Sequence, residues 1–123
     1  MPAALDHVTL KVADFARAAA FYDQALRPLG LTRLFGDGTF FAGYGAERPF
    51  FWIGQGAQSG GAHVAFAVPD RASVDAFHAA ALAAGGRDNG APGVRAHYHP
   101  TYYGAFVLDP DGHNVEAVCH AAT

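Results

Sequence analysis

The sequence predicts an α+β fold in which two βαβββ modules pair into a curved eight-stranded cup. Three observations lead to this prediction. Residues 7–30 align without a gap with residues 63–86, and ten of the aligned positions are identical. Each copy opens with an alternating apolar pattern and continues into an apolar helical pattern, and shorter strand-like runs follow. The 123 residues fit a single domain, so module one (1–57) and module two (58–123) are expected to share one core.

The first strand of each module alternates with a period of two. At positions 7–12 the even residues are apolar and the odd residues mostly polar, and positions 63–68 begin with the same His-Val pair. The even side chains need burial beneath a helix. The odd side chains, which include His7 and His63, are therefore expected to point into the cup.

A helix is expected directly after each of these strands. Asp14 and Asp70 stand where a helix N-cap is wanted, because their carboxylates can accept hydrogen bonds from free backbone N–H groups. Apolar residues then recur at spacings of three and four. Gly30 follows the first run and Gly85-Gly86 the second, and a left-handed glycine is a common helix stop.

Three short strands are predicted after each helix, because strand-like runs there are separated by glycine, proline and aspartate. The predicted ranges are 31–35, 39–44 and 50–53 in module one, and 94–98, 103–108 and 114–119 in module two. The sequence Asp109-Pro110-Asp111-Gly112 predicts a tight turn between the last two strands.

Composition excludes several classes of partner. The net charge is −3 and no run of like charge occurs, so no nucleic-acid partner is expected. No long apolar segment or leader pattern occurs, so we expect a cytoplasmic protein without a membrane contact. The single cysteine, Cys119, is expected to be a buried packing residue rather than a nucleophile. His78 and His113 are expected to be exposed to solvent.

Glu116 is the charged residue of the last strand, between Val115 and Ala117. A carboxylate that points into an enclosed cavity needs a cation or hydrogen-bond donors to offset its loss of hydration. His7, His63 and Glu116 together make a donor set for one divalent metal ion with open positions, such as Fe, Mn, Ni or Zn. The alternative for each histidine taken alone is a hydrogen-bonded structural role.

The same residues carry a family resemblance. The chain reads His-Val-x-Leu-x-Val-x-Asp at 7–14, His-Val-x-Phe at 63–66, and Asp-Pro-Asp-Gly-His-Asn-Val-Glu at 109–116. These motifs resemble the vicinal oxygen chelate superfamily, which includes glyoxalase I, extradiol dioxygenases, fosfomycin-resistance thiol transferases and bleomycin-binding proteins. The resemblance covers essentially the whole chain, and it implies metal ligation by His7, His63 and Glu116.

The resemblance also separates the branches of the superfamily. Glyoxalase I adds a glutamate from the last strand of its first module, but residues 50–53 here read Phe-Phe-Trp-Ile. The glutathione-dependent isomerase reaction is therefore not favoured. Thr9 matches a substrate-contacting position of the fosfomycin enzymes. However, the segment after Glu116 lacks their basic residue, so a phosphonate substrate is not favoured either.

An aromatic stretch before the closing hairpin supplies further candidates, namely His97, Tyr98, His99, Tyr102 and Tyr103. A dioxygenase-like site would place acid-base groups here, although plain packing explains such a stretch equally well. We favour Tyr103, since its strand parity places it with Ala105 and Val107, opposite an expected core face at Phe106 and Leu108. The candidate catalytic residues are thus Tyr103, His99 and Thr9.

The preferred interpretation is an enzyme in which the metal binds neighbouring oxygens of a small organic substrate and stabilises developing negative charge. A lyase, a dioxygenase and a thiol transferase all suit this donor set. The alternative is a metal-free module that binds an aromatic compound, as bleomycin-binding relatives do. By analogy of fold a homodimer is expected, either with modules exchanged between chains or with intact cups packed side by side.

Overall fold

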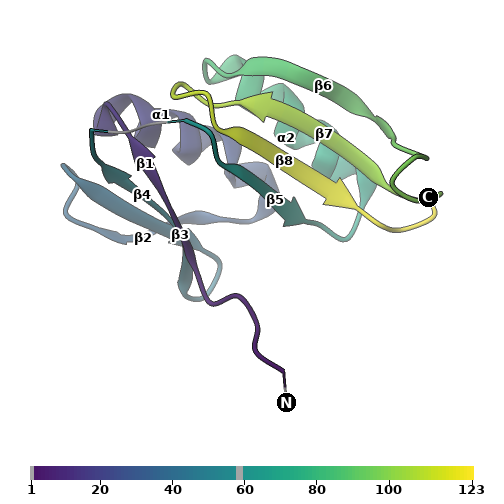
Figure 1. Ribbon diagram of the computed structural model, residues 1–123, viewed down its shortest axis with the longest axis horizontal. Coiled ribbons are helices and arrows are strands. Elements are labelled where there is room, and N and C mark those ends of the chain that lie inside the picture. Colours follow the sequence, from purple (N-terminus) through teal and green to yellow (C-terminus); the bar gives the residue numbers. More distant parts are fainter. Residues whose placement is uncertain (1, 58–59) are drawn as a thin grey trace.

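The computed structural model describes residues 2–57 and 60–123 and contains two modules with the same order of elements (Figure 1). Module one comprises β1 (Val8–Val12), α1 (Phe15–Ala25), the 3-10 helix η1 (Arg27–Leu29), β2 (Thr32–Gly36), β3 (Phe41–Gly45) and β4 (Pro49–Gln55). Module two comprises β5 (His63–Ala67), α2 (Arg71–Ala83), β6 (Arg87–Val94), β7 (Tyr103–Leu108) and β8 (Asn114–Cys119). The predicted pair of βαβββ modules is confirmed. The predicted module boundary after residue 57 falls at residue 58, which lies outside the described residues.

Each module forms its own four-stranded mixed sheet. The strand orders are β1-β4-β3-β2 and β5-β8-β7-β6, with the first strand parallel to the last and the other pairs antiparallel. Helix α2 lies behind the second sheet in Figure 1, and α1 packs against β4 of the first sheet, so each helix covers only one side of its sheet. We call the other side the open face. Among residues 2–57 and 60–123, no strand pairing joins the two sheets into a closed barrel.

The predicted N-caps begin the two helices as expected. The Asp14 side chain accepts a hydrogen bond from the backbone N–H of Arg17, and Asp70 accepts one from Ser73. Helix α1 ends earlier than Gly30, which instead ends η1 with a φ of 77°. No helix within residues 2–57 and 60–123 is both long enough and apolar enough to cross a membrane.

The core lies between the sheets and the helices and draws buried residues from both modules. In β1, Leu10 and Val12 are buried and Thr9 and Lys11 are exposed, as the alternation predicts. Cys119 is buried, as expected.

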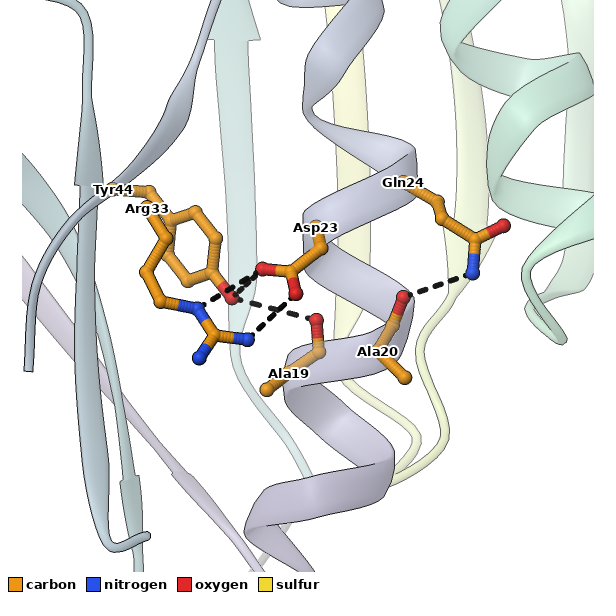
Figure 2. A network of polar contacts seen from close by, with 6 residues as sticks. All are labelled: Ala19, Ala20, Asp23, Gln24, Arg33 and Tyr44. Carbon is orange, nitrogen blue, oxygen red and sulfur yellow. Dashed lines mark hydrogen bonds and ion pairs between the residues drawn. The ribbon is translucent and has the colours of Figure 1, made fainter. Parts of the chain in front are cut away.

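Helix α1 is also fixed to its sheet by polar contacts (Figure 2). The Asp23 carboxylate accepts a hydrogen bond of 2.6 Å from Arg33 Nη2 in β2 and one of 2.8 Å from the Tyr44 hydroxyl in β3. One carboxylate thus holds both strands against the helix. Desolvation and the bond to Asp23 raise the pKa of Tyr44 well above its ordinary value, which keeps the phenol protonated as a donor.

The turn between β7 and β8 connects the two modules. Asp109 is 1% exposed and accepts a hydrogen bond of 2.6 Å from the Tyr22 hydroxyl on α1. Asp111 Oδ1 accepts a hydrogen bond of 2.8 Å from the backbone N–H of Ala13. This segment is therefore a contact between modules as well as a tight turn.

The two histidines that were expected at the surface lie in less open positions. His113 is 3% exposed, and its Nε2 lies 2.8 Å from the carbonyl oxygen of Lys11 in module one. The prediction was wrong because the turn folds back against β1. His78 is half-buried and its Nε2 lies 3.0 Å from Asp88 Oδ1, so its exposure was also overestimated.

Strand β6 is the element whose position was predicted wrongly. It spans Arg87–Val94, whereas the sequence predicted a strand at 94–98, a segment that lies mostly in a loop. The strand contains Gly90 and Pro92, and its pairing with β7 shifts register on both sides of Gly90. Because β6 is an edge strand with bulges, it tolerates residues that normally argue against a strand.

Candidate functional site

The open face of the second sheet carries a histidine and a buried glutamate in contact. His63 opens β5, and Glu116 lies in β8, the parallel neighbour of β5. His63 Nε2 lies 2.8 Å from Glu116 Oε1, while the side chains are 54% and 1% exposed respectively. A buried carboxylate beside a solvent-accessible imidazole offers oxygen and nitrogen donors toward the same point.

Tyr102 contacts the other oxygen of the Glu116 carboxylate. Its hydroxyl donates a hydrogen bond to Glu116 Oε2. Desolvation and the bond to Glu116 raise the pKa of Tyr102 well above its ordinary value, so the phenol remains a donor. We call His63, Tyr102 and Glu116 the second half-site.

His7 lies on the open face of the first sheet, next to β1. Its Nδ1 is 2.7 Å from Asp6 Oδ2, and Asp6 Oδ1 accepts a hydrogen bond of 2.8 Å from Arg48. The bond to His7 is the largest cause that lowers the pKa of Asp6. The Nε2 of His7 has no hydrogen-bond partner among the described residues, and the side chain is 57% exposed.

A cavity of about 330 Å³ surrounds His7. It is lined by Asp6, His7, Thr9, Arg48, Pro49 and Trp52. We call this group the first half-site. Thr9 therefore lies beside His7, as strand parity predicts. The sequence analysis did not identify Asp6 or Arg48. Asp6 could have been found because it directly precedes His7. Arg48 could not, because it reaches the cavity from the turn before β4.

Within the described part of one chain, the two half-sites do not form a common group of metal ligands. In Figure 1, β1 and β5 run in roughly opposite directions; His7 directly precedes β1 and His63 is the first residue of β5. Among residues 2–57 and 60–123, no group of three or more His, Cys, Asp or Glu side chains is placed to hold one metal ion. The structure brings together His63 and Glu116, and among the described residues His7 forms no metal-ligand group with them.

Tyr103 lies on the helix side of its sheet, so the predicted face was wrong. Its hydroxyl donates a hydrogen bond of 2.6 Å to Asp75 Oδ1 on α2, and the Arg71 guanidinium lies 4.8 Å from its ring centroid. Ala105 and Val107, which share its parity, are fully buried in the core. Large apolar side chains had suggested the core face at Phe106, but Phe106 instead pairs with Glu116 across the strands.

His99 packs against the ring of Tyr102. Its Nε2 is 2.6 Å from His120 Nδ1, and its Nδ1 accepts a hydrogen bond of 3.1 Å from the backbone N–H of Thr101. The rings of His99 and His120 stack at 4.8 Å, and each meets the Tyr102 ring edge-on. Nothing in the sequence distinguishes Tyr102 from its neighbours, because the loop conformation decides which side chain reaches Glu116.

The open face of the first sheet is aromatic. Trp52 contacts Phe35 and Phe41, with ring centroids 6.0 and 6.2 Å from its own. A Cβ atom at Gly43 would lie 2.8 Å from the indole, so only glycine lets the indole lie this close to β3. This surface can receive an apolar or planar group.

Comparison with known proteins gives a consistent set of similarities. Residues 4–117 match the model of the Glyoxalase/Bleomycin resistance protein/Dioxygenase superfamily. A search of curated proteins finds no match. Among solved structures, a glyoxalase/bleomycin resistance protein from Albidiferax ferrireducens is 30% identical, with a TM-score of 0.79 over 93% of this chain and 96% of that chain.

Two further structures resemble the fold at lower identity. A glyoxalase/bleomycin resistance protein/dioxygenase family enzyme from Burkholderia phytofirmans is 21% identical, with a TM-score of 0.72 over 97% of this chain and 100% of that chain. A mutant of the fosfomycin resistance protein FosX from Listeria monocytogenes, complexed with Mn(II) and 1S,2S-dihydroxypropylphosphonic acid, is 21% identical. Its TM-score is 0.70 over 96% of this chain and 90% of that chain.

Proposed function

Because the chain belongs to the glyoxalase/bleomycin resistance protein/dioxygenase superfamily, we propose that it is an enzyme that binds neighbouring oxygens of a small organic substrate on one divalent metal ion. The pairing of His63 with the buried carboxylate of Glu116 carries this proposal. Burying an ionised carboxylate costs free energy that a cation would offset. The nitrogen and oxygen donors fit a divalent transition metal such as Fe, Mn, Ni or Zn.

The third ligand in this proposal is His7 of a second copy of the chain. Since β1 and β5 run in opposite directions, a two-fold dimer can set the first half-site of one protomer over the second half-site of its partner. The contact of His7 Nδ1 with Asp6 leaves Nε2 for the metal. A carboxylate on the second ring nitrogen is typical of metal-ligating histidines.

A bound ion would supply Lewis acidity and stabilise negative charge that develops on substrate oxygens. The residues of the first half-site would receive the rest of the substrate. Thr9 offers a hydroxyl beside His7, and Trp52 offers an apolar wall. The structural relative FosX was solved with Mn(II), which supports the choice of a divalent metal in this fold.

Elemental analysis tests the metal. Protein purified without a metal-affinity step is expected to hold a divalent ion, and His63→Ala and Glu116→Ala are expected to lose it. Asp88→Ala, which removes an exposed carboxylate outside both half-sites, is the control and should keep it. Equal metal content in all four proteins would contradict the proposal.

Mixing two variants that are each expected to bind no metal tests whether the metal site is shared between two chains. His7→Ala and Glu116→Ala are each expected to bind no metal. After the two are unfolded and refolded together in equal amounts, about a quarter of the sites should recover, because each mixed dimer contains one intact site. No recovery would contradict a site shared between protomers.

A metal-free binding module is the second candidate, and the exposed aromatic surface around Trp52 favours it. Trp52 is the single tryptophan of the chain, so its fluorescence reports ligands at this surface. In the metal-free function, aromatic ligands would quench this fluorescence equally with and without a chelator. The metal-dependent function predicts that the chelator weakens the binding of ligands that carry neighbouring oxygens.

A further inference from the structure

We propose that Tyr102 is a positioning residue that caps one oxygen of Glu116, so that the carboxylate offers only its other oxygen to the metal ion. This inference rests on the proposed function, since it concerns the same ligand. It assigns a role to a side chain of the loop 95–102 that does not itself hold the ion.

The contacts of Glu116 carry the first step. The side chain is 1% exposed, and its two oxygens have separate partners. Oε1 faces His63 Nε2 at 2.8 Å, and Oε2 accepts the hydroxyl hydrogen of Tyr102. Of the two carboxylate oxygens, only Oε1 lies beside a second group that can ligate a metal, the His63 imidazole. A cation between His63 and Glu116 would therefore contact Oε1.

The second step is that the loop holds Tyr102 in place before any ligand arrives. The backbone N–H of Arg95 donates to the Tyr102 carbonyl at 2.7 Å, and the Tyr102 N–H donates to the His99 carbonyl at 3.2 Å. The Tyr102 ring also meets Tyr98, with ring centroids 4.8 Å apart, and His120, with centroids 5.4 Å apart. The phenol is therefore braced by its own loop and by the segment that follows β8.

Gly104 supplies a third, independent observation. A Cβ atom at this position would lie 3.1 Å from Tyr102 Cε1 and 3.4 Å from Glu116 Oε2. Even the smallest side chain would crowd the ring against the carboxylate. The absence of a side chain at Gly104 leaves the space in which Tyr102 reaches Glu116.

The chemical consequence is a carboxylate that is fixed and partly neutralised. The Tyr102 hydroxyl donates its hydrogen to Oε2, on the side of the carboxylate away from the oxygen that faces His63. Binding through one oxygen of Glu116 leaves more coordination positions for a substrate that brings two neighbouring oxygens. Tyr102 thus acts through Glu116, as outer hydrogen-bond partners of metal ligands do.

The test compares Tyr102→Phe with Tyr103→Phe. Both variants remove one phenolic hydroxyl from adjacent residues, but the Tyr103 hydroxyl contacts Asp75 on the helix side. Mn(II) affinity is measured by calorimetry, and Co(II) absorption in the visible range reports the geometry of coordination. Thermal unfolding of the metal-free proteins reports any general loss of structure.

Tyr102→Phe is expected to weaken Mn(II) binding about tenfold and to change the Co(II) spectrum. Tyr103→Phe should match wild type in both. Gly104→Ala, which keeps both Tyr102 and Glu116, should give a smaller change of the same kind. If Tyr102→Phe matches wild type in affinity and spectrum, the inference is wrong and the metal site stands; if wild type itself binds no metal, the proposed function fails and the inference fails with it.

Discussion

The two modules differ in chemistry at one pair of equivalent positions on their open faces. In module one, Thr9 of β1 lies opposite Trp52 of β4. In module two, Ala65 of β5, which aligns with Thr9 in the repeat, lies opposite Glu116 of β8. An indole thus occupies in one module the place that a carboxylate occupies in the other.

This difference separates what the core requires from what the site requires. Beneath both positions the neighbouring side chains are buried and apolar, with Phe51 in one module and Val115 in the other. The helix-facing pattern is kept because each sheet needs burial against its helix. The open face is free of that demand, so the repeated module can supply a metal ligand in one copy and an apolar wall in the other.

The helices differ in a similar way. Tyr22 and His78 are equivalent in the repeat, yet Tyr22 reaches across to Asp109 of module two, whereas His78 contacts Asp88 of its own module. At this equivalent position, α1 therefore makes a polar contact with the other module, whereas α2 makes one within its own module. Four substitutions test these differences.

The largest effect is expected at Asp109. Asp109→Ala removes a buried acceptor of the Tyr22 hydroxyl and of the His113 backbone N–H. Leaving these donors unpaired should lower the free energy of unfolding by about 3 kcal/mol. Urea unfolding measures the change. The matched control, Asp88→Ala, removes an exposed acceptor and should cost less than about 0.5 kcal/mol; equal losses would show that the bridge between modules contributes nothing special.

Trp52→Glu makes module one resemble module two. If the half-sites meet in a dimer, an added carboxylate should tighten Mn(II) binding about tenfold, or about 1.4 kcal/mol. Calorimetry against wild type checks this. Phe35→Glu places a carboxylate on the same face but away from the equivalent position, and should leave the affinity unchanged. No gain from Trp52→Glu would argue that Trp52 does not face the metal.

The Tyr22 contact predicts a dependence of stability on alkaline pH. Burial, and then Asp109, raise the pKa of the Tyr22 phenol in the folded state above its ordinary value of about 10. Below pH 10 the phenol is protonated in both states. Above it only the unfolded chain ionises, so stability falls by up to about 1.4 kcal/mol per pH unit.

Tyr22→Phe should reduce the loss of unfolding free energy per pH unit, measured by urea unfolding between about pH 9 and about pH 11. This range spans the ordinary tyrosine pKa of about 10. Tyr98→Phe, which removes an exposed phenol, is the control and should leave the slope as in wild type. An unchanged slope in Tyr22→Phe would mean that other groups set the alkaline limit.

The smallest effect is expected at His99, which touches Tyr102 but not Glu116. His99→Gln should weaken Mn(II) binding by no more than about threefold, less than for a direct partner of a ligand. His78→Gln, remote from Glu116 on α2, should have no effect in the same titration. A loss at His99 larger than that of Tyr102→Phe would point to a direct role for the imidazole.

Much of the architecture could be predicted from the sequence. The repeat, the alternation in β1 and the two N-caps depend on residues a few positions apart, and β7 and β8 have the bounds that the pattern predicts. Strand β6 could not be found this way. Its glycines and proline are tolerated because it pairs on one edge and bulges, which is a property of the assembled sheet.

The sequence by itself determined the two modules, the helix-facing residues and the place of His63 and Glu116 on one face. Tertiary structure alone decided that Tyr102 rather than Tyr103 meets the carboxylate, that His113 is buried, and that among the described residues His7 forms no metal-ligand group with His63. The physical reason is the separation along the chain between the residues that interact. Strand and helix patterns act between near neighbours, whereas these contacts depend on how a loop closes and on the opposite directions of β1 and β5, which only the packed chain fixes.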